Sequence, residues 1–251
     1  NSSNINILLY HQIGDAPDSE TNPNCFCSVK EFSNQMFFLK NSNYKVISLN
    51  EAMDMIFKIN NIDANYVVLT FDDGCEKFYD VTFPVLEKFN FPSTIYPLAG
   101  FLGKHAIING HEYKSLKILS QSMLLELNQL GVEIGAHTMN HVKLAQVDND
   151  KAITEVKKSK DTLEQVIGNK INSFSFPHGD YNSDVIDIVS QAGFTNALTC
   201  INGYANNATS AFEIPRKYIT YFDTLGKFKS KLNWNDRQYS ISHFWKNLDR
   251  D

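Results

Sequence analysis

The chain alternates between short apolar runs and amphipathic stretches, and this alternation constrains its fold more than any other feature. The runs INILLYH (5–11), YVVLTF (66–71) and NALTC (196–200) have the length and composition of buried strands. The stretches between them carry apolar residues every three or four positions, which indicates helices. Strand–helix alternation is typical of a parallel sheet. About eight strands in 251 residues favour a closed βα barrel over an open sheet.

No linker and no internal repeat divides the chain, so the sequence predicts an α/β fold with a single domain. We expect an irregular (β/α)7–8 barrel with parallel strands, because the runs NALTC (196–200) and RKYIT (216–220) have a loop rather than a clear helix between them. The domain is expected to span 1–251, with the barrel at about 5–223 and a polar tail at about 233–251.

Several local signals place the helices and loops. Ser28 and Glu31 have the spacing of a capping box at a helix start. Asn50 is expected to cap the helix EAMDMIF (51–57), and Asn182 is expected to cap the helix SDVIDIVSQAG (183–193). The stretch 99–113, rich in Gly and His, is expected to be a loop.

Charge and composition exclude several functions. The net charge is −5 with both signs mixed, which disfavours nucleic acid as a partner. No apolar run approaches the roughly 20 residues that span a bilayer, so no transmembrane segment is expected. The four cysteines show no CxxC spacing and do not settle the compartment. The chain opens at NSSNIN without Met, so we expect that a leader has been removed.

Unusual polar residues lie at the C-terminal ends of separate predicted strands. His11 ends the first strand, Asp72 and Asp73 end YVVLTF, His137 ends VEIGAH, and His178 follows SFSFP. In parallel βα barrels these ends converge on one face, where active sites form. The sequence therefore predicts a site that combines aspartates and histidines.

The adjacent carboxylates of Asp72 and Asp73 would repel each other in an apolar site unless a cation lay nearby. Successive side chains of an extended segment point in different directions, so one carboxylate can bind metal while the other moves protons. The alternative is an ordinary Asp-Asp-Gly turn.

The segment HTMNH (137–141) places two imidazoles four residues apart, within reach of one ion. Two His and one Asp make a set of ligands that leaves positions open for water and substrate. The alternative is a pair of surface histidines.

The segments TFDDG (70–74), HTMNH (137–141) and FSFPHGDY (174–181) resemble the ordered motifs of the polysaccharide deacetylase family, carbohydrate esterase family 4. The resemblance covers nearly the whole chain. LLYH (8–11) and IPR (214–216) resemble the circularly permuted branch that contains poly-N-acetylglucosamine deacetylases. The resemblance implies metal-dependent removal of N-acetyl groups from N-acetylglucosamine residues of a polysaccharide. It also implies a periplasmic, secreted or cell-surface location.

The resemblance assigns roles to individual residues. Asp73, His137 and His141 match the family's metal ligands, usually for zinc, with cobalt or nickel in related members. Asp72 matches the catalytic base, and the backbone N–H of His178 matches the donor to the oxyanion. His11 matches the general acid of the permuted branch, and His243 in SISH is the alternative.

Two positions depart from the family pattern. Ser175 stands where many members carry an Arg that contacts the base. Arg216 is the expected replacement, with a surface ion pair as the alternative. The His178 imidazole stands where Tyr or Phe is usual, and either a substrate contact or an accidental ligand fits it. Cys75, directly after the DDG, is expected to be a small packed residue.

Aromatic and proline side chains near the predicted rim are candidate sugar contacts. These candidates are Tyr113, Pro177, Tyr181 and Tyr204. Two other functions stay open: an O-acetyl esterase acting on an acetylated glycan, and a catalytically inactive glycan-binding domain. The sequence leaves the oligomeric state, the glycan linkage and the native metal open.

Overall fold

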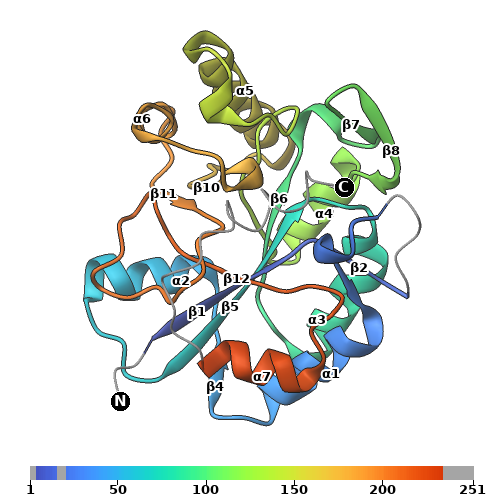
Figure 1. The fold of residues 1–251 in the computed structure, drawn as a ribbon, viewed down its shortest axis with the longest axis vertical. Coiled ribbons are helices and arrows are strands. Elements are labelled where there is room, and N and C mark those ends of the chain that lie inside the picture. The colour runs from blue at the N-terminus through green and yellow to red at the C-terminus, as the bar shows by residue number, and fades with distance from the viewer. Residues whose placement is uncertain (1–3, 16–20, 234–251) are drawn as a thin grey trace.

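A parallel sheet forms the centre of the molecule in a computed structural model that describes residues 4–15 and 21–233 (Figure 1). Five strands pair in the order β12–β1–β5–β6–β9, and β4 pairs beside β6 along the same edge of β5. Their bounds are β1 (Ile5–Tyr10), β4 (Tyr44–Val46), β5 (Asn65–Asp73), β6 (Thr94–Pro97), β9 (Glu133–Ile134) and β12 (Lys217–Tyr218). All of these pairings are parallel.

Two further strands close the sheet into a ring. β10 (Ser173–Ser175) and β11 (Asn196–Leu198) pair in parallel, and a bridge between Ala136 and Phe174 joins them to the end of β9. A second bridge, between Leu198 and Ile214, leads directly into β12, which pairs with β1. The predicted irregular barrel of parallel strands is therefore confirmed. The predicted polar tail lies outside the described residues.

Helices surround the strands (Figure 1). Their bounds are α1 (Val29–Lys40), α2 (Leu49–Asp54), α3 (Phe83–Phe89), α4 (Gln121–Gln129), α5 (Asn149–Ile167), α6 (Ser183–Gln191) and α7 (Leu225–Asn233). Single π-helical turns follow α2 and precede α3, at Met55–Ile59 and Phe78–Thr82. Short 3-10 turns lie at Pro23–Cys25, Ala99–Phe101, Leu144–Gln146 and Pro177–Gly179. Over residues 4–15 and 21–233, no helix is long and apolar enough to cross a membrane.

The helix caps follow the predictions at α6 and in part at α1. Asn182 caps α6 as predicted. Ser28 accepts a hydrogen bond from the Glu31 N–H, but the Glu31 carboxylate accepts from Leu225 N instead of completing a capping box.

The predicted cap of α2 at Asn50 is wrong. This helix begins earlier, where Ser48 and Glu51 form a complete capping box. That box satisfies two backbone donors at once, and Asn50 consequently lies inside the helix.

The predicted loop at 99–113 is also wrong in part. Two antiparallel strands, β7 (His105–Ile108) and β8 (His111–Lys117), form a hairpin there. Asn109 and Gly110 join them with φ of 52° and 80°. An Asn-Gly pair with two left-handed residues is the preferred connection of a two-residue hairpin, and the sequence contains this signal.

The two faces of strand β5 pack in different apolar clusters, and the inward face leads to the site. Val67, Leu69 and Phe71 pack in the larger apolar cluster, together with residues of the surrounding helices. Tyr66 and Val68 belong to a second cluster that joins residues of β1 and β6 with Ile214. Since side chains alternate along a strand, Thr70 and Asp72 continue this second, inward row.

Candidate metal and catalytic site

The end of β5 turns the two aspartates towards different partners. Asp73 has a left-handed backbone with φ of 71°, and Gly74 follows with φ of 74°. A Cβ atom on Gly74 would lie 2.5 Å from the Cβ of Pro97, so only glycine fits this bend. Asp72 thus faces the barrel interior, while Asp73 faces the histidines that follow β9.

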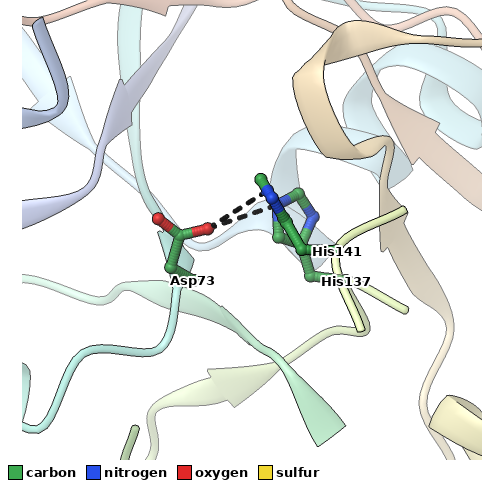
Figure 2. A group of neighbouring side chains, drawn as sticks. All are labelled: Asp73, His137 and His141. Carbon is green, nitrogen blue, oxygen red and sulfur yellow. Dashed lines mark ion pairs between the residues drawn. The ribbon is translucent and has the colours of Figure 1, made fainter. Parts of the chain in front are cut away.

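Asp73, His137 and His141 converge on one point (Figure 2). The Oδ1 atom of Asp73 lies 3.6 Å from Nε2 of His137 and 3.4 Å from Nε2 of His141. Two atoms bound to one tetrahedral zinc ion are separated by about 3.3–3.5 Å. The spacing of these side chains therefore fits a shared ion.

The donor set supports the same conclusion. His137 Nδ1 lies 2.8 Å from the backbone oxygen of Ser175, so the Nδ1–H must donate and Nε2 keeps its lone pair. The buried Oδ1 of Asp73 has no hydrogen-bond partner among the described residues. An unpaired carboxylate oxygen beside the lone pair of the His137 Nε2 is unfavourable unless a cation lies between them.

Burial tunes the protonation of these ligands. It lowers the pKa of both His137 and His141, so both imidazoles are neutral at neutral pH, the form that binds metal. Burial also raises the pKa of the Asp73 carboxyl to about 6. A bound cation favours the ionised carboxylate and would oppose this shift.

Asp72 is held by a fully buried arginine. Nη1 and Nη2 of Arg216 donate to the two oxygens of Asp72 at 2.8 and 2.7 Å, and Ser175 Oγ donates to Oδ2 at 2.9 Å. Arg216 Nε donates to the backbone oxygen of Thr199. Burial alone would raise the pKa of Asp72, but the guanidinium holds that pKa well below its usual range. The alternative of a surface ion pair is excluded, because Arg216 is 0% exposed.

One pocket of about 220 Å³ joins most of the predicted site residues. Its lining includes His11, Asp72, Asp73, His137, His141 and His178. These residues come from four strand ends, as the convergence argument predicts. Arg216 lies behind Asp72.

His11 follows β1 at one wall of the pocket. Its ring lies edge-on to the ring of Tyr218, with 5.3 Å between the centroids. Its buried Nδ1 has no hydrogen-bond partner within the described part of the chain. Burial lowers the pKa of His11, and the charges of Asp73 and Asp72 oppose this effect. The alternative acid, His243, lies outside the described residues.

The His178 imidazole packs against His141, with 4.3 Å between the ring centroids. Burial lowers the pKa of His178 to about 4, although its hydrogen bond with the backbone of His141 opposes the shift. The group of three donor atoms comprises Asp73, His137 and His141 and does not include His178. Cys75 is buried in a small apolar cluster, in agreement with a packing role.

Two of the predicted sugar contacts, Tyr181 and Tyr204, lie outside the pocket lining. Tyr204 is buried, and its hydroxyl donates to the backbone oxygen of Leu232. Tyr181 stacks on Phe176 and donates to Glu213. Neither residue is part of the pocket lining, whereas Tyr113 is. Pro177 is buried at the start of the turn that carries His178.

Sequence reasoning missed part of the pocket wall. Tyr218 lines the pocket and its hydroxyl lies 3.1 Å from Sγ of Cys25, a second lining residue. Ile108 and Leu116 of the β7–β8 hairpin also contribute. The position of Tyr218 follows from register, since it pairs with Leu9, two residues before His11.

Together, the parallel barrel and the cluster of one aspartate and two histidines at its strand ends define a barrel with a candidate metal-hydrolase site. The family model for polysaccharide deacetylases matches residues 60–197, which is more than half of the chain. The chain therefore belongs to the polysaccharide deacetylase family.

Individual relatives agree with this assignment. YxkH of Bacillus subtilis (strain 168), assigned by name to the polysaccharide deacetylases, is 26% identical over 214 residues, covering 85% of this chain and 71% of that protein. The poly-beta-1,6-N-acetyl-D-glucosamine N-deacetylase of Staphylococcus aureus (strain MSSA476) is 23% identical over 202 residues, covering 77% and 67%. The structure of the Streptococcus pyogenes deacetylase PplD in complex with acetate matches with a TM-score of 0.80 and 26% identity, covering 92% of this chain and 99% of that chain.

Proposed function

We propose that this protein is a metal-dependent hydrolase that removes N-acetyl groups from N-acetylglucosamine residues of a polysaccharide. It would cleave a carbon–nitrogen bond that is not a peptide bond. One observation carries the proposal: the Asp73–His137–His141 cluster shares a pocket with Asp72, a carboxylate that Arg216 keeps ionised. The similarity to a poly-N-acetylglucosamine deacetylase supports the choice of substrate.

Asp73, His137 and His141 would hold a divalent ion, for which zinc is the first choice and cobalt or nickel the alternatives. When bound, such an ion polarises the acyl carbonyl and makes water more acidic. Two nitrogen donors and one oxygen donor suit zinc and leave positions open.

The residues of the chain then divide the proton transfers. Asp72 is the proposed base that takes a proton from the attacking water, because Arg216 keeps it charged and in place. The backbone N–H of His178 is the proposed donor to the carbonyl oxygen as negative charge develops there. His11 is the proposed acid that gives a proton to the leaving amine as the C–N bond breaks, releasing acetate.

The proposed glycan contacts follow the pocket. Tyr113 offers an aromatic face at the pocket wall, and we assign it the stacking contact with a sugar ring. Pro177 and Tyr181 flank His178 on the opposite segment and stay proposed neighbours of the glycan. A periplasmic, secreted or cell-surface site of action stays a prediction from sequence.

The experiment that tests this function compares two acyl bonds. Zinc-loaded protein is incubated with an N-acetylglucosamine oligomer and with an O-acetylated, N-unacetylated glycan, and released acetate and new free amines are measured. The proposal predicts equal amounts of acetate and amine from the first substrate. Acetate from the second substrate alone would favour the O-acetyl esterase, and binding without any release would favour a glycan-binding domain.

A further inference from the structure

We infer that Glu155 of α5 is a positioning residue that fixes the metal-binding shape of the 138–141 turn. Its carboxylate contacts the two residues just before His141. The inference rests on the proposed metal site and adds a residue to which the sequence motifs assign no role.

Glu155 uses both carboxylate oxygens on the turn. Oε2 accepts from the backbone N–H groups of Met139 and Asn140 at 3.1 and 2.9 Å. Oε1 accepts from the side-chain amide of Asn140 at 2.7 Å. The side chain is 1% exposed, so water cannot substitute for these bonds. Lys151, one helical turn earlier, supplies a counter-charge at 3.1 Å.

The turn needs such support because its backbone is unfavourable. Thr138 and His141 both have left-handed conformations, with φ of 65° and 57°, and neither is glycine. Within the turn, the Thr138 hydroxyl accepts a hydrogen bond from the His141 N–H at 3.0 Å. Contacts from outside the turn add to this bond, and an error in the turn moves the His141 imidazole directly.

A second contact holds the turn from the other side. The N–H groups of Ala99 and Gly100 donate to the backbone oxygens of Thr138 and Met139 at 3.1 and 3.0 Å. A Cβ atom on Gly100 would lie 2.6 Å from the Met139 oxygen, so this approach requires glycine. The peptide groups of the turn are thus clamped through their oxygens on one side and through their N–H groups by Glu155 on the other.

The clamp requires acceptor atoms on the side chain of residue 155. Three donors meet this side chain, and an ionised carboxylate accepts bonds at both of its atoms. Glutamine keeps one acceptor oxygen, and the Asn140 amide can turn over to accept from the glutamine NH₂ group. Glu155→Met instead removes every acceptor with little change in volume.

A matched control lies further along the same helix. Glu164 also uses its carboxylate to accept from a backbone N–H, that of Ile171 at 2.9 Å, and pairs with Lys170. It supports the loop between α5 and β10 and is not a neighbour of the metal turn. Glu164→Met thus removes a comparable carboxylate-to-backbone contact without touching the turn.

The test measures binding of zinc to the metal-stripped full chain by calorimetry, with the visible spectrum of bound Co²⁺ as the second readout. Glu155→Met is expected to weaken zinc binding by roughly 10–100-fold, the range found for residues that orient metal ligands, and to change the cobalt spectrum. Glu164→Met is expected to stay within about threefold of the wild type, even where the melting temperature falls.

Wild-type affinity in Glu155→Met, or an equal loss in Glu164→Met, would overturn the inference. Should Glu155→Met fail to fold, Asn140→Ala removes one of the three bonds and is expected to weaken zinc binding several-fold; unchanged affinity there also counts against the inference. If the wild type itself binds no zinc, the proposed metal site fails and this inference fails with it. Wild-type binding combined with an unaffected Glu155→Met leaves the proposed function standing.

Discussion

Asp72 and Asp73 are neighbours in sequence, yet their surroundings give them opposite tasks. Asp72 is satisfied by Arg216 and Ser175, whereas the buried Oδ1 of Asp73 has no hydrogen-bond partner among the described residues. Asp72→Asn keeps the shape but removes the proton acceptor, so kcat is expected to fall by roughly 10²–10⁴-fold while zinc affinity stays nearly constant. Steady-state kinetics and zinc calorimetry on the same preparation measure the two effects. A variant that keeps more than a tenth of the wild-type rate would contradict the assignment of the base.

Arg216 stabilises the charge of Asp72, and this contribution depends on pH. Because the folded-state pKa of Asp72 lies below its unfolded value of about 3.9, the stabilisation is present above that pH and is lost as pH falls through the lowered pKa. Arg216→Met leaves an uncompensated buried carboxylate and is expected to cost about 3–5 kcal/mol at pH 7. The deficit should shrink towards pH 4, where the variant's Asp72 is protonated. Urea unfolding at both pH values measures this, and an equal deficit at both would contradict it.

At the residue scale, the sequence predicts what motifs encode locally. The strand-end positions of Asp72, Asp73 and His137 follow from an apolar run that stops at a polar residue. The burial of Tyr204 was not predictable, since it depends on tertiary contacts such as the hydrogen bond of its hydroxyl to the backbone oxygen of Leu232 and not on local composition. Glu155 leaves only a faint signal: a carboxylate in the apolar stripe between Ala152 and Val156 of a helix.

Among the elements, the β7–β8 hairpin adds to the pocket wall beyond the family motifs. Tyr113 on β8 lines the pocket, and His111 packs edge-on against it with 4.6 Å between centroids. Tyr113→Ala is expected to raise KM for an N-acetylglucosamine oligomer roughly fivefold, because stacking of a sugar on an aromatic ring contributes on the order of 1 kcal/mol. The kcat should change little. Kinetics with oligomers of increasing length measure the effect, and a loss confined to kcat would contradict the stacking role.

Helices and strands were predictable where their hydrophobic periodicity and their capping residues are clear in the sequence. The long helix α5 ends at Gly168, a residue type that favours a helix C-terminus, and φ of 72° there suits glycine. The hairpin was missed because its strands are short and carry His, Lys and Glu instead of an alternating apolar pattern. Its Asn-Gly turn was the available signal.

For the whole molecule, the parallel barrel brings distant segments of the chain to one pocket. An ion that binds only the folded protein stabilises it by about 2.7 kcal/mol at a hundredfold excess over Kd. In a domain of this size that amounts to roughly 5–10 °C in Tm. His141→Ala is expected to abolish this zinc-dependent shift. Thermal melts with and without zinc measure it, and an equal shift in His141→Ala would place the ion elsewhere.

The closed barrel was predictable from the number of strands and their alternation with helices, but the contacts that close it were not. The ring closes through single bridges such as Leu198–Ile214, which leave no periodic pattern in the sequence. Strands as short as β9 and β12 carry too few residues to show alternation. The fold class therefore follows from the pattern, whereas the register at the site follows from packing.

The central claim is that one ion held by Asp73, His137 and His141 is required for N-deacetylation. The most direct measurement titrates zinc into the metal-stripped protein and follows acetate released from an N-acetylglucosamine oligomer. The account predicts no release without metal, a linear rise to a plateau at one equivalent of zinc, and no recovery in His137→Ala. Release by the metal-free protein, or full recovery in His137→Ala, would contradict it.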